Sequence, residues 1–445
     1  MSTIEKHDMT QGKILLPLVS FTIPLVLGNL FQLTYNAADS VIVGKYVGEQ
    51  ALAAVGTSTP IMNIAILLIS GMCMGASVLM SSQYGAKDYD TLSRQISTTM
   101  LAGCGFSVVF SLLMLLLANP VLRLIRVPET AIPEAAAYLR IIFMGLIFTF
   151  MYNFLANTMR ALGDSKTPLY FLVTSAFLNI FGDLFFVVVL RWGVAGSAIA
   201  TVCSEGLCCL LCGIYIKKKI PLLCLGKKWW VFDKSLLGKT VSYGSTSAMQ
   251  QVCLQLGKLI IQSVVNTQGV AVMAAFTAVN RVDDFAYTPQ QNIGHAMTTF
   301  LAQNKGAGHK ERMKKGFQTG LLIELVYSIG LFCVIWGLAP QIMTLFAEDG
   351  DAQVVSLGIS YLHLISWMYI LPGLTNGVQG FFRGIVTLYS TFMNMFGRVV
   401  AVFVMIRLLQ MEFASLAWAN MVGWIVMLLF EVPLLVKSMR NGECG

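Results

Sequence analysis

The sequence predicts an all-α polytopic membrane protein, with twelve transmembrane helices in two six-helix bundles around a central cavity. Its 445 residues are 56% hydrophobic and only 12% charged, and their mean hydropathy is +0.72. A soluble domain carries about twice that share of charge, and a chain this apolar lacks the polar surface that a water-exposed globule needs. Apolar stretches and an internal repeat then predict how many helices form and how they are grouped.

Breaks at glycine, proline and charged residues divide the chain into twelve apolar segments, each at least as long as the roughly 20 residues that cross a bilayer. We expect all of them to be helices, because lipid offers the backbone polar groups no partner outside a helix or a closed barrel. The predicted spans are 14–43, 51–82, 93–119, 132–160, 166–190, 194–216, 236–265, 270–302, 315–345, 354–383, 386–408 and 413–436.

The distribution of basic residues predicts the orientation of these spans. With the N-terminus in the cytoplasm, 21 of the 30 Lys and Arg residues fall on the cytoplasmic side, five fall outside and four fall within spans. Cytoplasmic loops are enriched in Lys and Arg, so we expect a multi-pass protein of the inner (plasma) membrane with both termini in the cytoplasm. The net charge of +8 then reflects loops that face anionic lipid, and no nucleic-acid partner is expected.

Weak internal matches predict that the chain is a duplicated unit. SQYGAK at 82–87 resembles AQNKGAG at 302–308, and NIFGD at 179–183 resembles NMFGR at 394–398. The matches share their order and an offset near half the length, which makes chance agreement improbable. Repeats of this kind form two bundles around a cavity that opens to each side in turn. The predicted halves are an N-terminal lobe at 1–216 and a C-terminal lobe at 236–445, joined by a cytoplasmic loop at 217–235.

The first predicted helix carries a polar stripe in an otherwise apolar segment. Asn29, Gln32, Asn36 and Asp39 follow a spacing of 3, 4 and 3, which places them on one face within about 80° of arc. Pro24 lies upstream and removes a backbone donor, so the helix can bend there. The stripe indicates either an ion or substrate site or a hydrogen-bonded seam between helices; its carboxylate favours the site.

Two further helices of the first half carry polar pairs at one-turn spacing. These are Asn179 with Asp183, and Thr201 with Glu205, while Tyr138 adds a hydroxyl from a third helix. If these helices converge with the first, two carboxylates meet amide and hydroxyl oxygens in one bundle. Such a site can hold protons, or Na⁺ as a hard cation with oxygen ligands. A structural hydrogen bond is the alternative interpretation of Asp183.

The second half carries basic residues where the first carries acids. Gln251, Gln255 and Lys258 form a stripe without an acid, and Arg398 stands at the repeat position of Asp183. We therefore expect acidic, cation-binding chemistry to be confined to the first half. Lys258 and Arg398 have two open interpretations, contact with substrate or salt bridges with buried acids. The candidate acids are Glu205, Glu324 and Glu431.

A charged group in the eighth predicted span adds one secondary candidate. Arg281 and Asp284 can pair at a spacing of three residues, which leaves Asp283 pointing elsewhere. Asp283 is then either a functional acid or a structural one. The sequence contains no HExxH, P-loop or GxSxG motif in a matching context, so we expect neither an enzyme nor a bound cofactor beyond the coupling ion.

Three segments resemble the multidrug and toxic compound extrusion (MATE) family in combination. They are LTYNAADSVIVGKYVGEQALAAVG, FLNIFGDLFFVV and FLAQNKGAG, and the resemblance extends over essentially the whole chain. It implies two six-helix bundles that form a V-shaped cavity, export of organic cations in exchange for H⁺ or Na⁺, and function as a monomer among membrane lipids. Acids confined to the first lobe resemble the DinF-like type of the family.

Residue by residue, the resemblance implies that Asp39 is the first-helix acid, that Asn179 and Asp183 form the fifth-helix pair, and that Thr201 is the sixth-helix hydroxyl. Pro24 resembles the proline at which the first helix bends. The predicted site for coupling ion and substrate is Asp39, Asn179, Asp183, Thr201, Tyr138 and Asn36, with Na⁺ at the first four. The secondary candidates are Asp283, Glu205, Gln251, Gln255, Lys258 and Arg398.

Two other functions remain open at this point. A lipid-linked oligosaccharide flippase of the same superfamily has a more basic cavity, which Lys258 and Arg398 would suit. An intramembrane enzyme is a second class, but no motif in the sequence favours it.

Overall fold

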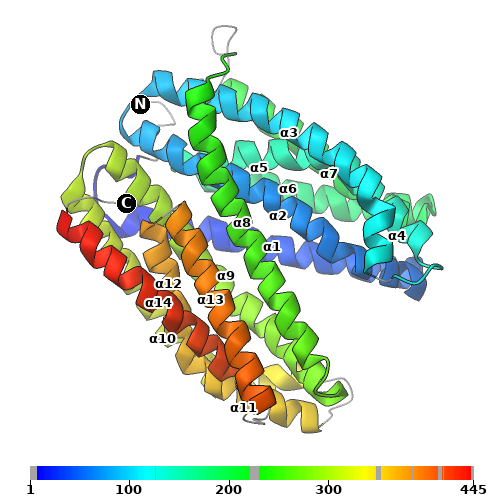
Figure 1. Cartoon of the computed structure of the whole chain (residues 1–445). Coiled ribbons are helices and arrows are strands. Elements are labelled where there is room, and N and C mark those ends of the chain that lie inside the picture. The colour runs from blue at the N-terminus through cyan, green and yellow to red at the C-terminus, as the bar shows by residue number, and fades with distance from the viewer. Residues whose placement is uncertain are drawn as a thin grey trace. The chain divides into compact units, whose positions relative to one another are not determined.

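A computed structural model describes residues 8–125, 127–220, 230–346, 352–382, 384–408, 413 and 415–441. Over these residues the chain is helical almost throughout and contains no strand (Figure 1). The prediction of an all-α polytopic fold is confirmed, since each of the twelve predicted spans coincides with a helix or with a broken pair of helices.

The first six spans are formed by seven helices. Residues 132–160, predicted as one span, form two helices that bend by 46° at Gly145. The sixth helix continues directly into a π-helical segment at Leu184–Val189. The helices are α1 Leu15–Tyr46, α2 Glu49–Gly85, α3 Tyr89–Leu124, α4 Ile132–Met144, α5 Leu146–Ala161, α6 Lys166–Asp183 and α7 Gly193–Lys219.

The last six spans are also formed by seven helices. A 3₁₀ turn at Trp367–Tyr369 breaks one span between α11 and α12, and a π-helical segment at Val404–Leu408 follows α13. The helices are α8 Lys234–Val265, α9 Val270–Gly306, α10 Lys310–Phe346, α11 Ala352–Ser366, α12 Ile370–Phe381, α13 Ile385–Phe403 and α14 Ser415–Asn441.

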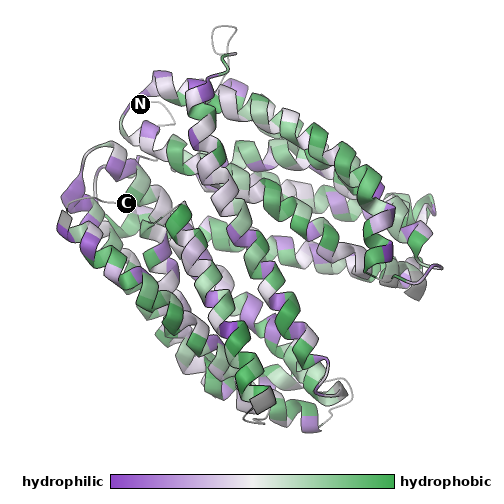
Figure 2. Ribbon diagram, viewed as in Figure 1, coloured by the Kyte–Doolittle hydropathy of each residue, from purple (hydrophilic) through white to green (hydrophobic). Residues whose placement is uncertain are grey.

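Most of these helices are apolar enough to cross a bilayer. Within the described part of the chain, nine spans meet the length and hydropathy expected of a membrane crossing, or ten when α4 and α5 count as one. Figure 2 shows apolar residues predominating along α3 and α14, whereas α8 is more mixed. The polar residues of α8 and α9 lower their hydropathy, which is why these two helices fall outside that set.

The chain forms two compact units whose sequence boundaries lie inside helices. Unit 1 contains Ile23–Ala248, and unit 2 contains Met9–Thr22 together with Met249–Gly445. The first helix of each half, α1 or α8, therefore begins in one unit and ends in the other. The predicted division at 217–235 stays a prediction, and residues 221–229 of that loop lie outside the described residues.

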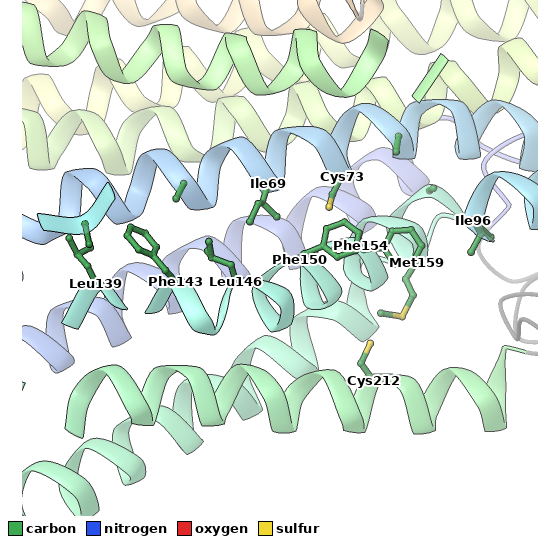
Figure 3. Packing of buried hydrophobic residues seen from close by; sticks show 14 of the residues in the cluster. Ile69, Cys73, Ile96, Leu139, Phe143, Leu146, Phe150, Phe154, Met159 and Cys212 are labelled. Atoms are coloured by element: carbon green, nitrogen blue, oxygen red, sulfur yellow. The ribbon is translucent and has the colours of Figure 1, made fainter. Parts of the chain in front are cut away.

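The core of unit 1 is a close packing of helices α2 to α5. Phe143, Phe150 and Phe154 lie in this core at 4% exposure or less, in the row of side chains drawn in Figure 3. A Cβ on Gly103 of α3 would lie 2.0 Å from the Phe150 ring, so glycine is what lets the ring fill this space. Since lipid tails are as apolar as leucine, such packing contributes more to holding these helices together than the hydrophobic effect does.

The core of unit 2 is centred on α9, α11 and the 3₁₀ turn. Tyr361 and Tyr369 are its largest fully buried side chains, and each uses its hydroxyl group. The Tyr361 hydroxyl accepts a hydrogen bond of 3.0 Å from Asn420 of α14, and the Tyr369 hydroxyl donates to Asp283 of α9. The unit 2 core is therefore stabilised by polar contacts as well as by apolar packing.

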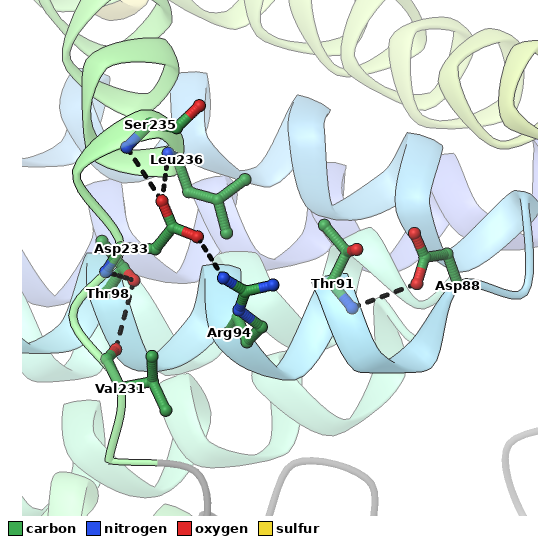
Figure 4. Close-up of polar contacts among 8 residues, drawn as sticks. All are labelled: Asp88, Thr91, Arg94, Thr98, Val231, Asp233, Ser235 and Leu236. Carbon is green, nitrogen blue, oxygen red and sulfur yellow. Dashed lines mark hydrogen bonds and ion pairs between the residues drawn. The ribbon is translucent and has the colours of Figure 1, made fainter.

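In unit 1, the segment that leads into α8 is tied to α3 by side-chain contacts (Figure 4). Arg94 forms an ion pair of 2.5 Å with Asp233. The Thr98 hydroxyl donates to the Val231 carbonyl over 3.3 Å and accepts from the Asp233 amide over 3.1 Å. Residues 231–233 are called the α8 strap below.

In unit 2, the segment that leads into α1 is tied to α10 in a comparable way. The Arg312 guanidinium donates to the carbonyls of Met9, Gln11 and Gly12 over 2.7–3.2 Å. The Met9 amide also donates to Gln303 over 3.1 Å. Residues 9–12 form the α1 strap, so each strap leads into the first helix of one half of the chain.

Candidate functional site

Two carboxyl groups from different helices meet in unit 1. Asp39 lies near the end of α1, and Asp183 is the last residue of α6. Asp183 is fully buried, and neither of its carboxylate oxygens accepts a hydrogen bond from a described donor. The two side chains are close enough for a shared proton to form a hydrogen bond between them. The Ser197 hydroxyl of α7 donates to Asp39 over 2.5 Å.

The local backbone explains how Asp183 reaches this position. The π-helical segment begins directly after Asp183, and π-helical turns are frequent at functional sites because they redirect side chains. A Cβ on Gly182 would lie 3.0 Å from the Cβ of Ala200, and one on Gly196 would lie 3.0 Å from the Phe186 carbonyl. Both glycines therefore permit close packing of α6 and α7, which brings Asp183 near the polar face of α7.

That polar face of α7 consists of Ser197, Thr201 and Glu205 at spacings of four residues. Thr201 accepts a hydrogen bond of 3.1 Å from Asn179 of α6, whose own side-chain oxygen has no partner among the described residues. Glu205 accepts a bond of 2.6 Å from Thr149 of α5. Thr201 and Glu205 were identified from the sequence, but Ser197 was not, although it lies one turn before Thr201 on the same helix face.

Two tyrosines border the carboxyl pair. The predicted residue Tyr138 of α4 is buried and lies within electrostatic reach of both Asp39 and Asp183. Tyr35 of α1, which the sequence analysis missed, interacts with Asp39 and Glu205. Asn36, also on α1, is an exposed residue in the structure.

The unit 1 cluster therefore offers carboxylate, amide and hydroxyl oxygens from α1, α6 and α7. Such a donor set suits a proton or Na⁺. The described part of the chain contains no group of three or more His, Cys, Asp or Glu side chains arranged to hold a metal ion. The structure brings the predicted residues Asp39, Asn179, Asp183, Thr201 and Tyr138 into one bundle, and their roles stay predictions.

The secondary candidates of unit 2 pair in ways that the sequence analysis did not foresee. Lys258 of α8 forms an ion pair of 3.2 Å with Asp284 of α9, so the predicted pair of Arg281 with Asp284 is wrong. Arg398 of α13 lies within electrostatic reach of Asp283. None of the three predicted acids is the partner of Lys258. The two remaining candidates on α8 are half-buried, and they are Gln251 and Gln255.

Acidic side chains are also buried in unit 2, and the expectation that cation-binding chemistry is confined to the first half stays a prediction. Asp283, Glu324 and Glu431 are 7%, 1% and 1% exposed. They lie on α9, α10 and α14. The repeat-related positions with basic residues lie on α8 and α13, whereas these acids lie on other helices.

Comparison with known proteins places the chain. The MatE family model matches residues 24–185 and 247–406, once in each half. Two probable multidrug resistance proteins of Bacillus subtilis are similar to this chain. YpnP is 32% identical over 85% of this chain and 84% of its own length. YoeA is 30% identical over 79% of this chain and 77% of its own length. An outward-facing structure of a multidrug resistance MATE family transporter of the MOP superfamily superimposes with a TM-score of 0.91 at 21% identity, covering 100% of this chain and 99% of that one. With a duplicated set of membrane-spanning helices and a family match in each half, this chain belongs to the MatE family.

Proposed function

We propose that this protein is a secondary active efflux transporter that exports organic cations across the plasma membrane in exchange for H⁺ or Na⁺. The observation that carries the proposal is the pair Asp39 and Asp183, two carboxyl groups from separate helices without a basic partner among the described residues. The names of the Bacillus relatives support export of several compounds. Both termini are proposed to lie in the cytoplasm, and the chain is proposed to act as a monomer.

The exchange follows from competition for negative charge. When Asp39 and Asp183 are ionised, they attract a cationic cargo. When a proton or Na⁺ occupies the pair, that attraction falls and the cargo leaves. Each ligand shifts the conformational equilibrium only by the difference between its affinities for the two states. A tenfold gradient of a monovalent ion supplies about 1.4 kcal/mol per ion for this cycle.

Pro24 is the proposed hinge of this cycle. It is the second residue of the part of α1 that belongs to unit 1, since the boundary lies between Thr22 and Ile23. A proline inside a helix removes one hydrogen bond and is a common cause of a kink. We expect Pro24→Ala to keep ion binding and to slow transport.

The test is transport of an organic cation dye by purified protein in lipid vesicles, with a pH gradient or a Na⁺ gradient imposed separately. Asp39→Asn and Asp183→Asn should each abolish gradient-driven transport, while Asp90→Asn, an exposed acid at the start of α3, should leave it unchanged. Wild-type activity in both aspartate variants, or wild-type transport that responds to neither gradient, contradicts the proposal.

The flippase alternative depended on two basic residues of the second half. Lys258 is paired with Asp284, and Arg398 lies within electrostatic reach of Asp283, so a carboxylate of the protein already interacts with each base. We therefore do not propose the flippase function. Accumulation of lipid-linked intermediates in cells that lack this protein would reopen it.

A further inference from the structure

Unit 2 contains a buried carboxyl group for which the function proposed above has no use. Glu324 lies on α10, is 1% exposed, and has no hydrogen-bond partner for either side-chain oxygen among the described residues. It also takes part in no ion pair there. A buried carboxylate without a donor or a cation costs several kcal/mol, so a missing positive charge is the feature to explain.

Two polar side chains, Ser328 and Gln290, meet Glu324 on the glycine face of α12. A Cβ on Gly373 would lie 2.9 Å from Ser328 Oγ, 3.2 Å from Gln290 Nε2 and 3.4 Å from Glu324 Oε2. Gln290 comes from α9 and is fully buried, and Ser328 follows Glu324 by one turn of α10. The lack of a side chain at Gly373 leaves these groups room to face one another.

The hydrogen-bond donors of this group are already committed elsewhere. Gln290 Nε2 donates to Ser328 Oγ over 3.1 Å and to the Tyr369 carbonyl over 2.8 Å. The Ser328 hydroxyl donates to the Glu324 backbone carbonyl over 2.7 Å. The Tyr369 carbonyl ends the 3₁₀ turn before α12, where a break in the helical pattern leaves a backbone acceptor to be satisfied by side chains.

The atoms that remain without a partner are all acceptors. They are Oε1 and Oε2 of Glu324 and Oε1 of Gln290. A proton on Glu324 turns one acceptor into a donor and removes the buried negative charge. A Na⁺ ion fits less well, because an amide nitrogen, not an oxygen, faces the point where the three side chains meet. We propose that Glu324 is a proton-binding site of unit 2, with the amide of Gln290 beside it.

Among the described residues, Glu324 takes part in no ion pair. Tyr327 on its own helix interacts with it electrostatically, and the Tyr327 hydroxyl donates to the Ala286 carbonyl of α9 over 3.1 Å. The Tyr369 carbonyl accepts from Ser328 in the same group. The hydroxyl of Tyr369 is committed to Asp283, whose basic neighbour is Arg398. Tyr369 therefore connects the two places: its carbonyl accepts from Gln290 and Ser328 beside Glu324, and its hydroxyl donates to Asp283.

The inference goes beyond the exchange site of unit 1, and its test does not need transport. Infrared difference spectra of the purified full-length protein in lipid, recorded across neutral pH, detect the carbonyl band of a protonated carboxyl group. We expect Glu324→Gln to remove one such band completely. Glu311→Gln changes an exposed glutamate in the first turn of the same helix and should leave the band in place. An unchanged spectrum in Glu324→Gln overturns the proposal.

A second variant keeps the test decisive if Glu324→Gln folds poorly. Gln290→Leu should keep the band but shift its frequency, because a hydrocarbon replaces the amide beside the protonated carboxyl group. A band that stays at its wild-type frequency contradicts the placement of Gln290 beside that group. Loss of the band when NaCl, but not KCl, is added at constant pH assigns the site to Na⁺ and overturns proton binding. Failure of the Asp39→Asn transport test would leave these spectra unaffected, so the two proposals fail separately.

Discussion

The end of α6 in unit 1 and the end of α13 in unit 2 are repeat-related positions with opposite charge. Each helix runs into a π-helical segment, directly after Asp183 in α6 and six residues after Arg398 in α13. In unit 1 the acid meets a second acid, Asp39, whereas in unit 2 the base lies within electrostatic reach of an acid, Asp283. Similar backbones can therefore carry either an acid near another acid or a base near an acid, and only the first arrangement lacks a positive charge.

Exchanging the charge at Asp183 should have the largest effect. Asp183→Arg introduces the side chain that unit 2 carries, and its guanidinium should pair with Asp39 in place of a coupling ion. A buried ion pair between this guanidinium and Asp39 is worth several kcal/mol, which a coupling ion would have to overcome. We therefore expect gradient-driven transport to fall at least about a hundredfold. Initial rates of dye transport in vesicles measure this. Asp90→Arg is the matched control, and equal transport rates in the two variants would contradict the role given to the charge at position 183.

A packing change in unit 1 should have the next largest effect. Gly103→Ala places a methyl group 2.0 Å from the Phe150 ring, so the ring must move or α3 must shift. Overpacking of this kind costs about 1–3 kcal/mol. Gly105→Ala, two residues along, meets nothing within 4 Å and serves as the control. Thermal unfolding in detergent compares them, and equal midpoints would contradict this account of the core.

The two straps should respond unequally to loss of their arginines. Arg312 makes four hydrogen bonds to three carbonyls, whereas the Arg94 side chain is 42% exposed and makes one ion pair. We expect Arg312→Ala to destabilise the α1 strap by about 1.5 kcal/mol. Arg94→Ala should destabilise the α8 strap by about 0–1 kcal/mol, as for exposed ion pairs. Hydrogen exchange of the strap amides measures both, and a larger effect for Arg94 would reverse the ranking.

The smallest expected effect concerns the loop before α3. Asp88 caps the helix, accepting a hydrogen bond of 3.1 Å from the Thr91 amide, and this contact holds the pKa of Asp88 below its usual value. In unit 2, the residue just before α10 is a histidine, His309, so that helix has no carboxylate at the corresponding position. Asp88→Ala should cost about 0.5 kcal/mol at neutral pH, the low end of the range for a helix cap, because Asp88 is exposed. Because the folded-state pKa is lowered, this contribution is lost as pH falls through it, so the variant and the wild type should converge in acid. A difference that is independent of pH excludes the carboxylate as the source.

The fold was predictable from the sequence because lipid demands long apolar helices, and the twelve segments follow from their length alone. The bend at Gly145 and the 3₁₀ turn at Trp367–Tyr369 were not predictable, because both lie inside continuous apolar stretches and depend on tertiary contacts. In unit 1, periodicity identified Asp39, Asp183 and Thr201 because each belongs to a stripe on one helix face. It missed Ser197, which is a common residue in any helix interface.

In unit 2, important side chains carry no periodic signal in the sequence. Glu324 is a single acid on its helix face, so no periodic pattern marks it. Its environment is set by Gln290 and Gly373, which lie about 35 and 50 residues away in the sequence and on other helices. The pairing of Lys258 with Asp284 over Arg281 depends likewise on how α8 packs against α9. Contacts between helices of this kind leave no local signal.

Because α1 and α8 each have residues in both units, the protein is difficult to divide into two folded parts. A cut in the loop at 217–235 gives two fragments, but neither fragment is a unit. The first retains Met9–Thr22, which pack with unit 2, and the second retains the start of α8 up to Ala248, which packs with unit 1. Each piece would thus lack part of its own core and carry part of its neighbour's, so separately produced halves are expected to depend on co-expression to become soluble in detergent as folded protein.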